Sequence, residues 1–180
     1  MKVLLFNGPP GSGKDTIARA VLPFLPGRVD TFKLAQPIRN WVCSTLGVPD
    51  EWIEGHKADP FPTFGGTVRE AMIWYSESVM KPRFGPTVFA DILVRNLAAS
   101  TAAYATVTDC GFQTEVDVVR REHPTAHLFQ MHRDGCSFKG DSRYWVWGLP
   151  ELTDRIDNND RTVIQVGERV AQRALGHPFR

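Results

Sequence analysis

The chain has few cysteines, a balanced charge and no long hydrophobic run. Its three cysteines are odd in number and form no Cys-x-x-Cys pair, which argues against a disulfide framework or a zinc ribbon. The five histidines form no recognised metal-ligand spacing. The apolar run after Lys2 is broken at Asn7, too early for a secretory leader or a membrane span, so we expect a cytosolic protein without a membrane partner.

Charge and length narrow the function classes further. There are 21 Lys and Arg residues against 20 Asp and Glu, so electrostatics give no reason to expect a stable nucleic-acid partner. A chain of 180 residues with 42% hydrophobic content predicts one compact domain with room for a buried sheet flanked by helices.

The most informative segment follows the apolar run Val3-Leu4-Leu5-Phe6. It reads Gly-Pro-Pro-Gly-Ser-Gly-Lys-Asp-Thr over residues 8–16 and contains the spacing Gly, four residues, Gly-Lys. Such a loop between a strand and a helix binds phosphates through backbone amides, a lysine charge and the positive end of the helix. We therefore predict a nucleoside triphosphate site at Gly11, Ser12, Gly13 and Lys14. A Gly/Pro-rich turn without a ligand would not need the lysine.

One position departs from this pattern, because Asp15 stands where Ser or Thr usually supplies a hydroxyl to magnesium, and Thr16 follows. Asp15 could hold Mg²⁺ through water or could only favour the helix N-terminus electrostatically. Thr16 is expected to face a phosphate or the metal. Asp109, at the end of a predicted strand, is a further Mg²⁺ candidate, with a helix cap as its other reading.

Alternating apolar runs and helical patterns predict an α/β fold, a parallel sheet of about five strands flanked by helices in three layers. Strands are predicted near 2–6, 29–32, 105–108, 127–131 and 152–156. Helices are predicted after the phosphate loop and near 36–46, 67–79, 86–97 and 163–174. The helix at 67–79 opens with the capping box Thr67-Val68-Arg69-Glu70. The Pro- and Gly-rich stretch 47–66 is expected to be a mobile connection.

Basic residues follow the second predicted strand, at the sheet edge where ligands of parallel sheets collect. Lys33 comes directly after it, and Arg39 lies in the first turn of the next helix. A cation there is unfavourable for the helix dipole, so an anionic ligand is one explanation. A solvated arginine is the other.

Several stretches together resemble the bacteriophage deoxynucleoside monophosphate kinases. They are Gly-Lys-Asp-Thr of the phosphate loop, Phe-Lys-Leu-Ala-Gln-Pro-Ile-Arg at 32–39, Thr-Val-Arg-Glu-Ala-Met at 67–72, Arg-Phe-Gly-Pro at 83–86, Val-Thr-Asp-Cys-Gly-Phe-Gln-Thr-Glu at 107–115 and Asp-Asn-Asn at 157–159. The resemblance spans most of the chain, although only the phosphate loop is a strong motif alone. It departs from the family at Gly111 and Lys81, where the family often carries arginine.

This resemblance implies a single P-loop kinase domain with an adenylate-kinase-like fold over residues 1–180. A monophosphate-binding insertion would span about 33–99 and a short lid about 133–147, and Asn158 would lie at the nucleotide. By that analogy Arg39 and Arg69 hold the acceptor's phosphate. Further acceptor residues would be Lys33, Trp74, Lys81, Arg83, Asp91 and Arg95.

Some of these assignments have structural alternatives. Trp74 could stack on a base, but an aromatic residue in an amphipathic helix more often packs in the core. Asp91 and Arg95 lie four residues apart and could form a surface ion pair.

The lid segment, residues 133–147, combines basic residues with Gly135 and Gly140. Arg133 and Arg143 are our candidates, with Lys14, for stabilising the charge on a migrating phosphoryl group. A solvated hairpin is the alternative.

The resulting prediction is a kinase that uses ATP and Mg²⁺ to phosphorylate a deoxynucleoside monophosphate, located in the host cytoplasm if phage-encoded. Whether it forms a homodimer is left open. Two alternatives also remain: a kinase of another phosphorylated metabolite, such as a phosphomevalonate-like precursor, and a nucleotide-binding assembly ATPase without a small acceptor.

Overall fold

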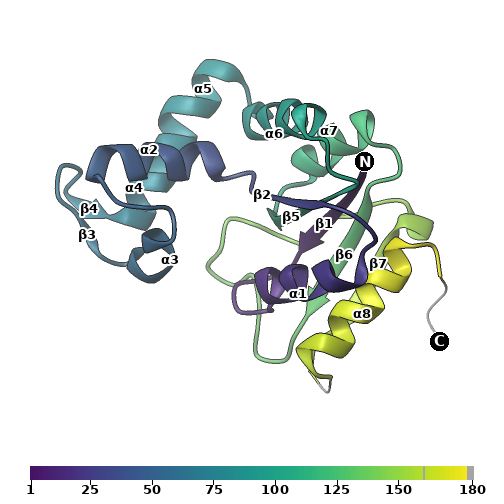
Figure 1. Cartoon of the computed structure of the whole chain (residues 1–180). Helices are drawn as coiled ribbons and strands as arrows, with labels where there is room; N and C mark the ends of the chain where they lie inside the picture. Colours follow the sequence, from purple (N-terminus) through teal and green to yellow (C-terminus); the bar gives the residue numbers. More distant parts are fainter. Residues whose placement is uncertain (160, 178–180) are drawn as a thin grey trace. The chain divides into compact units, whose positions relative to one another are not determined.

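The computed structural model describes residues 1–159 and 161–177, and the chain divides into two compact units (Figure 1). The first, called the sheet unit, comprises Met1–Lys33 and the chain from Ala90 onward. The second, called the helical unit, comprises Leu34–Phe89.

The sheet unit is built on five parallel strands in the order β2-β5-β1-β6-β7. Numbered among themselves along the chain, these strands lie in the order 2-3-1-4-5. Their bounds are Lys2–Asn7 (β1), Val29–Phe32 (β2), Tyr104–Cys110 (β5), His127–His132 (β6) and Thr153–Asp157 (β7). All five predicted strands are confirmed, and with the glycine-rich loop after β1 they form an α/β P-loop NTPase fold.

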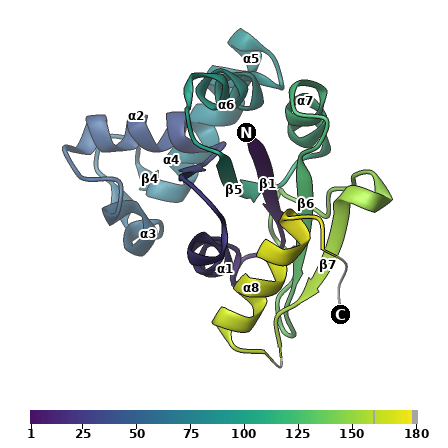
Figure 2. The ribbon, with the colours of Figure 1, turned by 45° about the vertical axis from the view of Figure 1, so that its right-hand side comes forward.

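Helices cover both faces of this sheet, as Figure 2 shows. On one face lie α1 (Lys14–Val21) and α8 (Val163–Ala174), packed on Leu4 and Phe6 of β1. The opposite face is covered by α6 (Val88–Ala99) and α7 (Gln113–Glu122). Because successive residues of a strand point to opposite faces, the apolar run of β1 is buried on both sides. The central strand therefore carries the phosphate loop on a rigid base.

The helical unit holds α2 (Gln36–Leu46), α3 (Trp52–His56), α4 (Val68–Trp74), the π-helix η2 (Tyr75–Met80), α5 (Lys81–Phe84) and the hairpin β3 (Pro60–Phe61) and β4 (Gly66–Thr67). The capping box at Thr67 and Glu70 is present as predicted. The stretch 47–66, which we expected to be a mobile connection, contains α3 and the hairpin. These elements are too short to give a periodic pattern, and they are held by packing of Ile53 and Phe61 in an apolar cluster.

Within the described part of the chain, no helix combines the length and apolar character that a membrane span requires.

Gly167 of α8 allows that helix to lie directly against α1. A Cβ at position 167 would come within 2.6 Å of the backbone oxygen of Ala20 and 2.8 Å of its Cβ. We predict that Gly167→Ala destabilises the protein. The clash costs about 1–3 kcal/mol and outweighs the roughly 1 kcal/mol that alanine gains in a helix. Urea unfolding measures the difference.

The matched control is Gly55→Ala in α3, where a Cβ meets nothing within 4 Å. Equal or higher stability of Gly167→Ala would contradict the close packing of these two helices.

Candidate active site

The loop between β1 and α1 has the geometry that a phosphate cradle requires. Gly13 has a φ of 89°, in the left-handed region, and a Cβ there would lie 2.6 Å from Nδ2 of Asn158. At Gly8 a Cβ would lie 2.7 Å from the backbone oxygen of Met131. Both positions therefore require glycine, one for its backbone angle and for space, the other for space alone.

Side chains hold the carbonyl oxygens of this loop. The Lys14 ammonium donates to the carbonyls of Gly8 (2.7 Å) and Pro9 (2.8 Å). Asn158 Nδ2 donates to the carbonyl of Ser12 at 3.0 Å, and Arg133 Nη1 to that of Gly11 at 3.3 Å. Carbonyl oxygens repel phosphate, so tying these four to donors favours an anion in the cradle.

Two further observations point to an anionic ligand. The hydroxyl of Ser12 is fully buried and has no hydrogen-bond partner among the described residues. An orphaned buried donor in a phosphate loop fits a ligand oxygen. In addition, the pKa of Lys14 is lowered to about 8, first because burial disfavours the charged form and then because Arg143 lies near. A bound polyphosphate would relieve this penalty.

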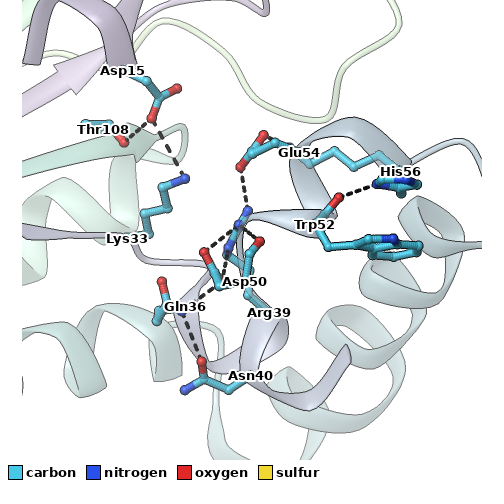
Figure 3. Close-up of polar contacts among 11 residues, drawn as sticks. Asp15, Lys33, Gln36, Arg39, Asn40, Asp50, Trp52, Glu54, His56 and Thr108 are labelled. Carbon is cyan, nitrogen blue, oxygen red and sulfur yellow. Dashed lines mark hydrogen bonds and ion pairs between the residues drawn. The ribbon is translucent and has the colours of Figure 1, made fainter. Parts of the chain in front are cut away.

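Asp15 has protein partners on both sides. Its Oδ1 accepts a hydrogen bond from the Thr108 hydroxyl at 2.8 Å and lies 3.9 Å from the Lys33 ammonium (Figure 3). This carboxylate thus links the start of α1 to the end of β5 and to the residue after β2. Its position favours a role in placing Lys33 over a direct metal contact.

The fit to Mg²⁺ rests on few protein ligands. Thr16 is exposed at the start of α1, and Asp109 lies half-buried near the end of β5. No group of three or more His, Cys, Asp or Glu that could hold a metal occurs among residues 1–159 and 161–177. Mg²⁺ commonly binds through one or two carboxylates together with substrate phosphates, so these hard oxygen donors suit a metal that arrives with the nucleotide.

The carboxyl edge of the sheet also receives Arg143 from the lid segment. Its guanidinium bonds to Asp141, with Nε to Oδ1 at 2.9 Å and Nη2 to Oδ2 at 2.6 Å. The pKa of Arg143 is raised first by this hydrogen bonding and also by the charges of Asp109 and Glu115. Arg143 is therefore a permanent cation close enough to Lys14 to influence its titration.

In the helical unit, Arg39 is buried and strongly bonded. It donates to both carboxylate oxygens of Asp50 at 2.7 Å, to the Asp50 carbonyl at 2.8 Å and to Glu54 at 2.6 Å (Figure 3). A phosphate at Arg39 would have to displace one of these carboxylates. The pattern therefore gives Arg39 a structural role that the sequence did not indicate, because both partners lie in the segment expected to be a loop.

The other acceptor candidates of the helical unit differ in exposure and partners. Arg69 is exposed in the first turn of α4, while Lys81 forms an ion pair with Glu77 at 2.6 Å. Trp74 packs against Trp41 and Phe64 but keeps 44% of its surface exposed. The remaining candidate, Arg83, is exposed in α5.

Asp91 and Arg95 lie on α6 of the sheet unit. They line an open groove together with Val118, Arg121 and Glu122 of α7. This groove is lined by residues of α6 and α7, not by residues of the phosphate loop. The assignment of Asp91 and Arg95 to the acceptor stays a prediction.

Sequence reasoning missed two residues that shape the site. Asn7 is fully buried at the end of β1, and its side chain bonds to Cys110 and to the lid segment. Asp141 holds Arg143. The sequence shows an asparagine directly before the phosphate loop, but it does not show that this side chain is buried or that its partners lie far along the chain.

Comparisons with known proteins give only weak similarities. No family model matches, and no curated protein matches. A sugar kinase from Janibacter sp. HTCC2649 shares 16% identity at a TM-score of 0.45, covering 98% of this chain and 93% of that one. A gluconokinase from Sinorhizobium meliloti 1021 shares 12% identity at a TM-score of 0.46, covering 97% and 91%. Agreement this low assigns neither a family nor a substrate.

The pKa of Lys14 gives a prediction for nucleotide binding. The ammonium is charged below about pH 8 in the free protein and loses its proton above that value, whereas bound phosphates favour the charged form. We expect ATP affinity to weaken as pH rises from 7 to 9.5, by at most about tenfold per pH unit for one coupled proton. Fluorescence titration with an ATP analogue measures it.

Lys14→Gln is the control, since it removes the titrating group and should flatten the profile. A wild-type affinity that stays constant through pH 8 would contradict the contact between Lys14 and the nucleotide.

Proposed function

We propose that this protein is an ATP-dependent kinase that transfers the γ-phosphoryl group to a deoxynucleoside monophosphate, giving the diphosphate and ADP. The observation that carries the kinase assignment is the cradle itself. It combines a fully buried hydroxyl at Ser12 that has no partner in the part of the chain that the structure describes, a lowered lysine pKa at Lys14 and a fixed cation at Arg143. The acceptor class rests on the resemblance to the phage kinases.

The triphosphate would occupy the loop, with Lys14 leaving the carbonyls of Gly8 and Pro9 to contact phosphate oxygens. Ser12 would donate its hydroxyl, and Asn158 would keep the loop in shape through the Ser12 carbonyl. Mg²⁺ bound with the nucleotide, near Thr16 and Asp109, would neutralise phosphate charge. These contacts would position the γ-phosphorus without a covalent bond between the protein and the phosphoryl group.

Phosphoryl transfer needs cations aimed at the migrating group, since charge is spread over its oxygens. Arg143 suits this role because its guanidinium is held beside the lysine. Arg133 is exposed and reaches the Gly11 carbonyl, so it can turn toward the nucleotide without breaking a strong bond. No general base is required, because an acceptor phosphate oxygen is already ionised.

The acceptor's phosphate would bind Arg69, the exposed arginine of α4. Arg39 would support this site by fixing α2 to Asp50 and Glu54, and would contact phosphate only if a carboxylate moved away. Trp74 retains enough exposed surface to receive a base.

A kinase of another small metabolite is favoured by one observation. Arg39 is already paired, so the phosphate-binding set is smaller than the resemblance implies. An acceptor panel with coupled ADP detection decides between the two. We expect turnover with one or more deoxynucleoside monophosphates. Turnover only with other phosphorylated metabolites would favour the alternative, and ATP hydrolysis without any acceptor would favour an assembly ATPase.

Lys14→Ala should lower kcat by at least about 10²-fold, because it removes a preorganised cation from the transferred phosphate. Circular dichroism should show an intact fold. Arg19→Ala, which removes an exposed basic side chain from the same helix, is the matched control. Near-normal rates for Lys14→Ala would refute the role of Lys14 at the transferred phosphate.

Arg69→Ala should raise the KM of the acceptor with little change in the KM of ATP, since the residue would bind the acceptor alone. An initial-rate series with each substrate varied in turn measures both constants. Arg28→Ala on the sheet unit, which removes another exposed arginine, is the control. An unchanged acceptor KM removes Arg69 from the site.

A further inference from the structure

The second half of the lid segment is tied to the sheet unit by hydrogen bonds. We call residues Arg143–Trp147 the strap. Asn7 Nδ2 donates to the carbonyl of Tyr144 at 3.0 Å, and its Oδ1 accepts from the amide of Val146 at 3.2 Å. Tyr144 also donates its amide to the carbonyl of Gly111 at 3.1 Å. One buried amide side chain and one strand end thus hold the start of the strap.

Two glutamines hold the rest of the strap. Gln130 donates to the carbonyl of Val146 at 2.7 Å, and Val146 is fully buried. Gln113 exchanges two hydrogen bonds with the backbone of Trp147, at 2.8 and 2.9 Å. A segment with this many core contacts is fixed in place, so movement of the lid segment should be confined to residues 133–140, before Asp141.

Gly111 forms the seat under the Arg143 side chain. A Cβ at position 111 would come within 2.8 Å of the Cβ of Arg143, 2.4 Å of its Cγ and 2.5 Å of its Cδ. The Cβ cannot move while the strap backbone is held, and moving Cγ and Cδ requires another side-chain rotamer, which carries the guanidinium to a different place. Any residue larger than glycine at 111 would therefore move Arg143.

Asp141 fixes the other end of the same side chain. It binds the guanidinium through two oxygens and also accepts the backbone amide of Arg143 at 2.9 Å. The carboxylate is 11% exposed and the arginine side chain 27%, so water competes little for this pair. A bidentate arginine–carboxylate pair is well defined in orientation.

We propose that Gly111 and Asp141 are positioning residues that hold Arg143 beside the phosphate loop before any nucleotide binds. The cation for phosphoryl transfer is thus preorganised and is not delivered by closure of the lid segment. The expected effect on kcat rests on the proposed function. The position of Arg143 in the nucleotide-free protein does not depend on it.

A double-mutant cycle tests the seat. Arg143→Ala should lower kcat by about 10²–10³-fold, as loss of one preorganised donor does. Gly111→Ala should lower kcat by up to about 10²-fold, because it displaces the same guanidinium. In the Arg143→Ala background Gly111→Ala should have no further effect. If instead the two losses multiply, Gly111 does not act through Arg143 and the proposal fails.

Asp141→Asn gives a second cycle that does not depend on the folding of Gly111→Ala. It should lower kcat more than either KM, with partial rescue by Asp141→Glu and no added loss in the Arg143→Ala background. Glu168→Gln on the exposed side of α8 is the charge-matched control. Equal effects of Asp141→Asn with and without Arg143 would overturn the positioning role.

A measurement on the nucleotide-free protein separates this inference from the proposed function. The Nε–H of Arg143 donates to Asp141 in the free protein. In NMR spectra of the nucleotide-free protein this Nε–H should therefore be protected from exchange with water. Gly111→Ala and Asp141→Asn should each remove that protection, while Gly55→Ala leaves it in place.

If these changes occur but no acceptor is phosphorylated, the proposed function fails and the positioning of Arg143 by Gly111 stands. An Arg143 Nε–H that stays protected in Gly111→Ala shows that Arg143 keeps its place without the glycine, and this result overturns the inference whatever the enzyme's activity.

Discussion

The buried side chain of Asn7 joins the three segments from which the candidate site is built. It ends β1, directly before the phosphate loop, and its amide bonds to the carbonyl of Cys110 at the end of β5. The same amide holds the strap through Tyr144 and Val146. Both its donor and its acceptor are satisfied, as a fully buried polar group requires. Asn7 thereby helps to fix the relative positions of Lys14 and Arg143.

The charges at the carboxyl edge form a set in which each cation has a defined partner. Lys14 is held by loop carbonyls and Arg143 by Asp141, with Asp109 and Glu115 contributing from β5 and α7. Burial makes the lysine charge costly in the free protein, and the nearby arginine adds to that cost. Such a site gains most from an incoming polyanion, because the ligand removes a penalty that the fold maintains.

In the helical unit, a buried arginine that we predicted to bind the acceptor is already held in ion pairs. Arg39 is 3% exposed and bonded to Asp50 and Glu54, which lie on the segment that follows α2. Breaking such a pair leaves a buried charge and is strongly unfavourable, so the arginine first of all fixes the unit's own fold. Arg69, on the neighbouring helix α4, carries no such constraint and is the better placed cation for an anion from solution.

The sequence alone determined the phosphate loop, the five strands, the principal helices and the capping box at Thr67, because each depends on local spacing and on alternation of apolar residues. Only the tertiary structure decided which distant residues meet. Short elements such as α3 and the β3–β4 hairpin are stabilised by packing, so no local pattern in the sequence predicted them. The pairing of Arg143 with Gly111, and of Arg39 with Asp50, joins segments through space. Such contacts are set by backbone positions that local propensities do not encode.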